Sequence, residues 1–164
     1  MTKINDWIYA WKVCKKYGIK WNPFYNLGNA HFTCTVKGEN AIIKINPFYR
    51  NFKGTFMHEV GHVLFWRKRG QRFYYCIEIC GQEAMYKRLE CRGRSFIGLL
   101  EEEALASRFS AKAVKTKGNK DYLIKAFYTY TSCFYYHLNK IGKDGQDVVK
   151  TTDVVYSCIR RIEK

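Results

Sequence analysis

The spacing of apolar residues in the first part of the chain predicts one helix followed by a small sheet. Apolar side chains recur at helical spacing over residues 7–17, and Gly18 ends the pattern. Two runs of strand-favouring residues follow, at 31–36 and 41–45, separated by a polar segment that contains glycine. This pattern predicts a β-hairpin, or a small antiparallel sheet, with Ile43 and Ile45 on one face.

Two further helices are predicted in the middle of the chain. The apolar run at 56–66 predicts a helix that ends near Gly70. Alanines that follow three glutamates predict another helix at 101–116, because acidic residues are favoured in a first helical turn. Between them, residues 71–94 mix aromatic, basic and cysteine residues without a clear period, and their pattern assigns no element.

The C-terminal third is also predicted to be helical. Residues 117–119 contain a glycine and should break the preceding helix, and Asp121 should cap the next one. A last amphipathic helix is expected at 146–162. We therefore expect an α+β fold, a single domain over residues 1–164 in which the small sheet packs on a mostly helical bundle.

The helix predicted at 56–66 contains the signature His58-Glu59-x-x-His62 and lies at the centre of the expected fold. Residues four apart on a helix lie one above the other, so both imidazoles can reach a single metal ion; otherwise they are ordinary buried histidines. In zinc metalloproteases two such histidines hold the ion and the glutamate is the general base. We therefore predict zinc on His58 and His62, with Glu59 as the catalytic residue. Gly61 predicts close packing against a neighbouring backbone, because glycine weakens a helix.

A catalytic zinc takes about three protein ligands, so the motif needs a further donor. The remaining histidines, His31 and His137, do not follow His62 at the spacing of a longer histidine motif. The acidic cluster at 101–103 is the better source, because one glutamate on a helix beside the motif would complete a His, His, Glu set. The alternative is that all three acids are solvated and only stabilise the start of their helix.

The composition is that of a folded and strongly basic protein. Hydrophobic residues make up 47% of the sequence and aromatic residues 17%, which excludes an intrinsically disordered chain. With 29 Lys and Arg against 14 Asp and Glu, the net charge is +15, which favours nucleic acid or another acidic partner. A solvated basic surface without a specific partner explains the charge equally well.

Seven cysteines at irregular spacing favour a reducing environment over a disulfide framework. The chain starts without the pattern of a secretory signal and holds no apolar run long enough for a membrane span. We therefore expect a cytoplasmic protein without a membrane partner. Cys76, Cys80 and Cys91 belong either to a second metal site or to the buried core, and their spacing favours buried thiols.

Three segments, within about residues 40–115, resemble the ImmA/IrrE-type zinc metallopeptidases. That family combines a strand, a short lead into His-Glu-x-x-His, and a later helix with Glu-x-x-Ala-Asn-x-Phe-Ala. The resemblance implies a minimal zincin-like, or gluzincin-like, domain and an intracellular protease. The segments that carry it are Ile43-Lys44-Ile45-Asn46, Gly54-Thr55-Phe56-Met57-His58-Glu59-Val60-Gly61-His62, and Glu103-x-x-Ala106-Ser107-x-Phe109-Ser110.

The same resemblance assigns residues of the later helix. It implies that Glu103 is the third zinc ligand, that Ala106 allows close helix packing, and that Ser107 takes a small polar position beside the site. Glu102 is the alternative third ligand. The Leu-Met-Pro ending that is common after this helix in the family is replaced here by residues 112–115.

The leading hypothesis from the sequence is therefore a zinc metalloprotease that hydrolyses peptide bonds of an intracellular protein substrate. Zinc held by the two histidines and Glu103 would polarise the scissile carbonyl, and Glu59 would move the proton of the attacking water. A substrate strand would pair with an edge of the hairpin, most simply at 41–45. The oxyanion donor is left open among the tyrosines and His137.

The alternative is a basic protein that binds nucleic acid or a host factor on a zincin scaffold, with little or no proteolysis. The lysine-, asparagine-, tyrosine- and isoleucine-rich composition favours a phage or mobile-element origin. Basic residues that could hold phosphates alternate with aromatic residues that could stack bases in one segment. These residues are Arg67, Lys68, Arg69, Arg72, Lys87, Arg88, Arg92 and Arg94, with Phe73, Tyr74, Tyr75 and Tyr86.

Overall fold

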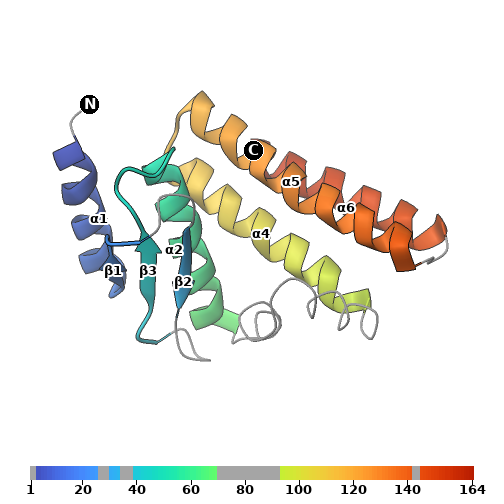
Figure 1. Cartoon of the computed structure of the whole chain (residues 1–164), viewed down its shortest axis with the longest axis horizontal. Helices are drawn as coiled ribbons and strands as arrows, with labels where there is room; N and C mark the ends of the chain where they lie inside the picture. The colour runs from blue at the N-terminus through green and yellow to red at the C-terminus, as the bar shows by residue number, and fades with distance from the viewer. Residues whose placement is uncertain (1–2, 26–29, 34–38, 70–92, 142–144) are drawn as a thin grey trace.

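Five helices and three short strands make up the described part of the chain in the computed structural model (Figure 1). The described residues are 3–25, 30–33, 39–69, 93–141 and 145–164. The sheet and its two neighbouring helices form one side of the molecule, and three longer helices form the other (Figure 1). The fold is therefore α+β and mostly helical, as the sequence predicts.

The sheet consists of β1 (Lys20–Asn22), β2 (Ala30–Thr33) and β3 (Ile42–Ile45), in the order β1-β3-β2. β2 pairs with β3 antiparallel, whereas β1 pairs with β3 in parallel. The sheet as a whole is therefore mixed, and the prediction of an antiparallel sheet missed β1. Because β3 is the central strand, the prediction that residues 41–45 offer a free edge to a substrate is wrong.

Helix α1 (Lys3–Tyr17) begins before the predicted residue 7 and ends where the sequence predicts. Gly18 follows with φ of +60°, a left-handed conformation that suits glycine at a helix C-terminus. The Arg67 guanidinium donates hydrogen bonds to the carbonyls of Tyr17 and Gly18, the latter at 2.9 Å. Arg67 therefore satisfies backbone groups at the end of α1, which is a structural role for one member of the predicted basic segment.

Helices α2 (Phe52–Arg69) and α4 (Gly93–Ala113) pack against each other more extensively than any other pair of elements. A Cβ built on Gly61 would lie 2.9 Å from the Ala106 Cα, which is closer than real side chains approach. The predicted close packing of Gly61 is confirmed, and its partner is Ala106. Helix α4 begins earlier than predicted, since residues 93–100 belong to it as well as the acidic cluster.

Helix α5 (Lys117–Ile141) starts at the residues that were predicted to break a helix. The physical reason is a cap that the sequence pattern did not indicate: the Thr116 hydroxyl accepts a hydrogen bond from the Asn119 N–H at 3.2 Å. Asp121 therefore lies inside the helix and does not cap it. The predicted break falls earlier, between Ala113 and Lys117.

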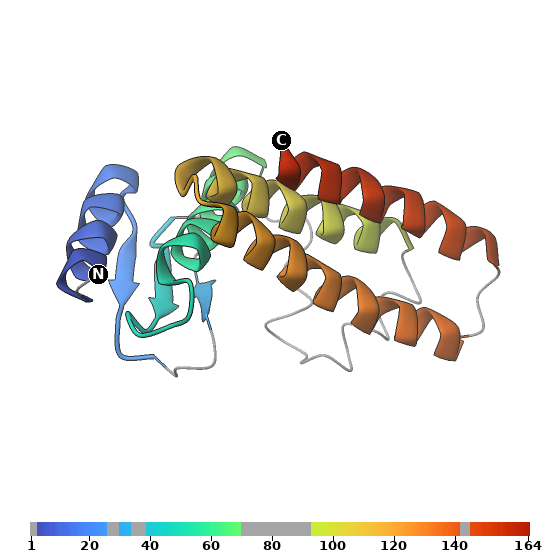
Figure 2. The same cartoon turned by 90° about the horizontal axis from the view of Figure 1, so that it is seen from above.

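The last helix, α6 (Gly145–Glu163), agrees with the prediction at 146–162 and runs beside α5 (Figures 1 and 2). None of the described helices combines the length and the apolar character needed to cross a bilayer. Buried side chains of α4, α5 and α6 form one core cluster, and those of α1, the sheet and α2 form a second. The contact between α2 and α4 therefore joins the two halves of the fold.

Replacing Gly61 by alanine is expected to lower the free energy of unfolding by about 1–3 kcal/mol, because the new methyl group meets the Ala106 backbone. This expected loss is the net change, after the gain of about 1 kcal/mol that alanine brings to a helix interior, because the obstructing atoms belong to a backbone that cannot move aside easily. Urea unfolding followed by circular dichroism measures the change.

Gly118→Ala is the matched control, because a Cβ on Gly118 meets nothing within 4 Å. This variant should be neutral or more stable than the wild type by up to about 1 kcal/mol. Equal stability of Gly61→Ala and the wild type would contradict the described contact between α2 and α4.

Candidate metal centre

The two histidines of the signature lie one turn apart on α2 and turn their imidazoles toward each other. The Nε2 atoms of His58 and His62 are 3.0 Å apart, and the rings meet edge to face at 84°. His62 is buried, whereas His58 is partly exposed to the cavity described below. The helical spacing therefore produces the convergence of nitrogens that the sequence predicts.

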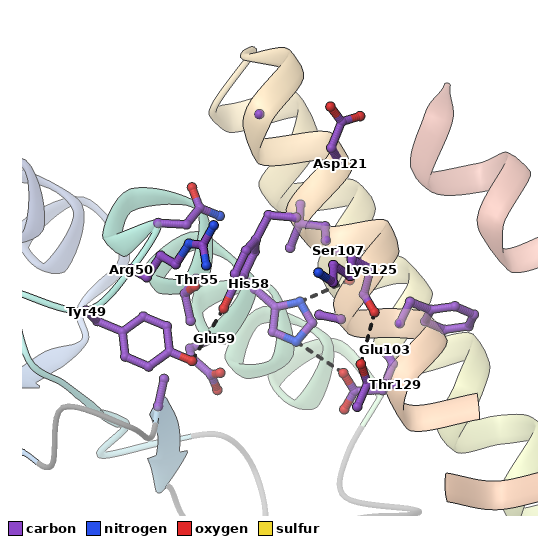
Figure 3. A pocket seen from close by; sticks show the side chains of 17 residues that line it. Tyr49, Arg50, Thr55, His58, Glu59, Glu103, Ser107, Asp121, Lys125 and Thr129 are labelled. Carbon is purple, nitrogen blue, oxygen red and sulfur yellow. Dashed lines mark hydrogen bonds and ion pairs between the residues drawn. The ribbon is translucent and has the colours of Figure 1, made fainter. Parts of the chain in front are cut away.

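Glu103 approaches the same point from α4 (Figure 3). Its Oε2 atom lies 3.1 Å from His58 Nε2 and 3.4 Å from His62 Nε2. One donor atom from each of the three residues therefore falls within a single small space, and the three residues could hold one metal ion. The structure brings these predicted residues together, and the carboxylate it selects from the acidic cluster is Glu103.

Glu102 lies on the other side of His62. Its Oε1 atom is 3.4 Å from His62 Nδ1 and accepts a hydrogen bond of 2.9 Å from the Trp66 indole N–H. Glu102 therefore orients the His62 ring from behind and does not share the space between the histidines and Glu103. This position argues against the alternative assignment of Glu102 as the third ligand.

Ser107 has the same relation to His58 that Glu102 has to His62. The Ser107 hydroxyl lies 3.2 Å from His58 Nδ1, the ring nitrogen that faces away from Glu103 (Figure 3). With Nδ1 of each histidine protonated toward its oxygen partner, both Nε2 atoms present lone pairs to the Glu103 carboxylate. Such an arrangement of three electron donors is stable only around a positive charge, and outer partners of this kind commonly orient metal-binding histidines.

The pKa shifts of His62 and Glu103 also indicate that a positive charge is favoured between them. Burial lowers the pKa of His62, but the carboxylates of Glu103 and Glu102 outweigh this effect and raise it to about 10. Burial alone would raise the pKa of Glu103, yet the neighbouring histidines hold it well below its usual range. Without a metal ion, a proton on His62 therefore supplies the positive charge beside Glu103.

Glu59 follows His58 on the helix, so its side chain points in a different direction and is not one of the three converging donors. Its carboxyl group is buried in the wall of the cavity. Burial raises the pKa of Glu59, and the charge of Glu103 adds to the increase, although the two histidines act in the opposite direction. A carboxylate with a raised pKa beside a metal site is a suitable general base.

A cavity of about 840 Å³ opens beside His58, Glu59 and Glu103. Two phenols in its wall, Tyr49 and Tyr122, have hydroxyl oxygens 3.4 Å apart. The remaining lining residues come from the start of β2, the lead into α2, and helices α2, α4 and α5 (Figure 3). They are Ala30, Arg50, Asn51, Thr55, Ser107, Gly118, Asp121, Leu123, Lys125, Ala126, Phe127 and Thr129.

Nothing in the sequence distinguishes Tyr49 and Tyr122 from the other tyrosines of the chain, which has thirteen. The two residues lie far apart in the sequence and share a wall because the start of α5 lies beside the lead into α2, where the Asn51 side chain donates a hydrogen bond of 2.9 Å to Asn119 Oδ1. The role of Glu102 as a partner of His62 was also missed, although its place beside Glu103 drew attention to it. His137 was the other candidate for the oxyanion donor, and its side chain lies outside the described residues. The side chain of His31 also lies outside them.

Cys76, Cys80 and Cys91 also lie outside the described residues. So does most of the basic and aromatic segment, which leaves the alternative nucleic-acid site untested. Within the described part of the chain, His58, His62 and Glu103 form the one cluster of potential metal ligands.

No family model, curated protein or solved structure matches this chain. The resemblance to ImmA/IrrE-type metallopeptidases therefore stays a prediction from the three short segments.

The three neighbouring glutamates allow a direct test of the ligand set. Glu103→Gln should weaken zinc binding more than about a hundredfold, because it removes an anionic ligand, whereas Glu102→Gln should weaken it about ten- to a hundredfold. Competition titration against a zinc indicator measures both. Glu101→Gln is the control and should bind as the wild type does, since Glu101 is exposed. A larger loss for Glu102→Gln than for Glu103→Gln would contradict this assignment.

Proposed function

We propose that this protein is a zinc metallopeptidase of minimal zincin-like architecture. The observation that carries the proposal is the convergence of His58, His62 and Glu103, from two different helices, beside a cavity that also contains Glu59. Two histidines and one carboxylate form the protein ligand set of several zinc hydrolases. Glu59 stands in the sequence where such enzymes place their general base.

The spacing of the three donor atoms supports zinc. Ligands at about 2.0–2.1 Å from a tetrahedral zinc ion lie roughly 3.3–3.4 Å from one another. The corresponding distances here are 3.0, 3.1 and 3.4 Å. These distances fall within about 0.4 Å of those expected around a zinc ion, whereas calcium would require more oxygen ligands at longer distances.

Zinc bound at this site would polarise the carbonyl of a scissile peptide bond and lower the pKa of water. Glu59 then acts as general base: it removes a proton from the attacking water and delivers it to the leaving amine. The raised pKa of Glu59 suits both steps, because the group must accept a proton and release it again within one turnover. Glu102 and Ser107 hold the two imidazoles in their orientations throughout.

Tyr49 is the best-placed donor for the oxyanion that peptide hydrolysis generates. Burial raises its pKa to about 12, with a further contribution from the hydrogen bond with Tyr122, so the phenol keeps its proton at neutral pH. The Tyr122 hydroxyl donates to the Tyr49 oxygen, which leaves the Tyr49 proton for a substrate oxygen. Thr55 Oγ1, buried in the same wall, makes no hydrogen bond to a described residue and offers a second polar contact.

A peptide substrate is favoured by the position of β2. This strand is an edge of the described sheet, and its first residue, Ala30, lines the cavity. An extended peptide that pairs with β2 would gain main-chain hydrogen bonds and run past the three donors. The edge proposed for the substrate is therefore β2, because β3 already has a partner on each side.

The proposal is tested with Glu59→Gln, a variant that keeps the size of the side chain and loses its basicity. Zinc content should stay at the wild-type value, and hydrolysis of a mixed peptide library, followed by mass spectrometry, should fall by about 10²–10⁴-fold. Glu101→Gln should retain full activity. Equal activity of Glu59→Gln and the wild type, or a zinc-loaded wild type that cleaves none of the library, would contradict the proposal.

A further inference from the structure

The outer face of α1 carries a stripe of large apolar side chains exposed to solvent. Ile4 is 67% exposed, Trp7 42%, Ile8 46% and Trp11 61%. These positions are spaced as i, i+3, i+4 and i+7, so they form one continuous surface along the helix. Half of the exposed large hydrophobic residues in the described part of the chain are therefore gathered on this one short helix.

The stripe is bordered by positive charge. Lys12, Lys15 and Lys16 are all exposed, and the Lys15 Nζ lies over the Trp11 ring at 5.4 Å from its centroid. The one acidic residue of α1, Asp6, is turned toward the protein and lies 3.6 Å from the Lys53 ammonium. The outer face of α1 is therefore both apolar and cationic, with no acidic side chain on it.

The opposite face of α1 already fixes the helix to the domain. Ala10 and Val13 are buried in the core shared by the sheet and α2, and Arg67 binds the carbonyls at the end of the helix. Of the four stripe residues, Trp7 also packs on Trp21, with ring centroids 4.8 Å apart, whereas Ile4 and Trp11 are the most exposed. α1 also lies at the end of the molecule remote from α5 and α6, so a partner on its outer face would leave the cavity accessible (Figures 1 and 2).

We propose that α1 binds the surface of an anionic lipid bilayer, lying in the plane of the interface. Tryptophan and isoleucine would enter the boundary between headgroups and acyl chains, and the lysines would remain at the level of the anionic headgroups. The helix is about 22 Å long, and the +15 charge of the chain adds attraction at longer range. This peripheral mode of binding needs no membrane-spanning helix, and it differs from the sequence-based expectation of a protein without a membrane partner.

Charge favours this partner over a second copy of the chain. Two such faces in contact would bring two lysine-rich surfaces, each on a molecule of charge +15, close together. An anionic bilayer instead complements the lysines and the apolar stripe at the same time. The inference is independent of the proposed peptidase activity, because it uses none of the residues of the metal centre.

The test is flotation of the full-length protein with vesicles of phosphatidylcholine alone or mixed with phosphatidylglycerol. Binding should require phosphatidylglycerol and weaken with added salt. Neutralising Lys12 and Lys15 together to serine should weaken binding about 25-fold, which is about fivefold per lysine. Ile4→Ser combined with Trp11→Ser should weaken it about tenfold or more. Melting temperatures should change little, because all four side chains are exposed.

Matched controls alter the same residue types elsewhere. Lys112→Ser with Lys115→Ser changes two exposed lysines, and Phe48→Ser with Tyr156→Ser changes two exposed aromatic residues. Both control variants should bind vesicles nearly as the wild type does. Equal losses in the lysine controls would overturn the proposal, since they would show attraction by total charge alone. No vesicle binding by the wild type, or self-association that Trp11→Ser abolishes without vesicle binding, would also overturn it.

Discussion

The close approach of α2 and α4 is the constraint on which the rest of the structure depends. The two helices run antiparallel, and they touch at Gly61 and Ala106 because neither residue holds the backbones apart. A second contact fixes the start of α2, where the Ser110 hydroxyl donates a hydrogen bond of 2.6 Å to the Gly54 carbonyl. Only at this separation does the short Glu103 side chain reach the nitrogens that project from α2.

The same contact between α2 and α4 buries ionisable side chains. It buries Glu59, Glu103 and His62 between two helices, and buried ionisable groups destabilise a fold unless charges of opposite sign compensate them. In the absence of a metal ion, the raised pKa of His62 and the lowered pKa of Glu103 make these two residues an ion pair. A metal ion held by the same three donors would replace that proton, and by linkage its binding would stabilise the folded state.

The sequence predicted the parts of this arrangement that depend on local spacing. A separation of four residues was sufficient to place His58 and His62 together, and a glycine within the helix was sufficient to predict a close neighbour. The selection of Glu103, and a small residue at position 106, came from the resemblance to a family, whereas the pairing of Gly61 with Ala106 came from the structure, because local periodicity cannot show which helices meet.

Features that depend on distant segments were missed. The parallel pairing of β1 with β3 has no local signal, since its strands are separated by β2 in the chain. The cap at Thr116, which moved the start of α5 to Lys117, was hidden by a glycine that usually ends a helix. The cavity wall formed by Tyr49 and Tyr122 likewise requires the start of α5 to lie beside the lead into α2, which no residue pattern specifies.

The proposed metal centre is tested most directly by X-ray absorption spectroscopy of the purified protein after it has been loaded with zinc. We expect one zinc per chain, nitrogen and oxygen donors at about 2.0–2.1 Å, and the outer-shell scattering of two imidazoles, all lost in a His58→Ala and His62→Ala double variant. Sulfur donors at about 2.3 Å, which would assign the metal to cysteines, or the absence of bound zinc would contradict it.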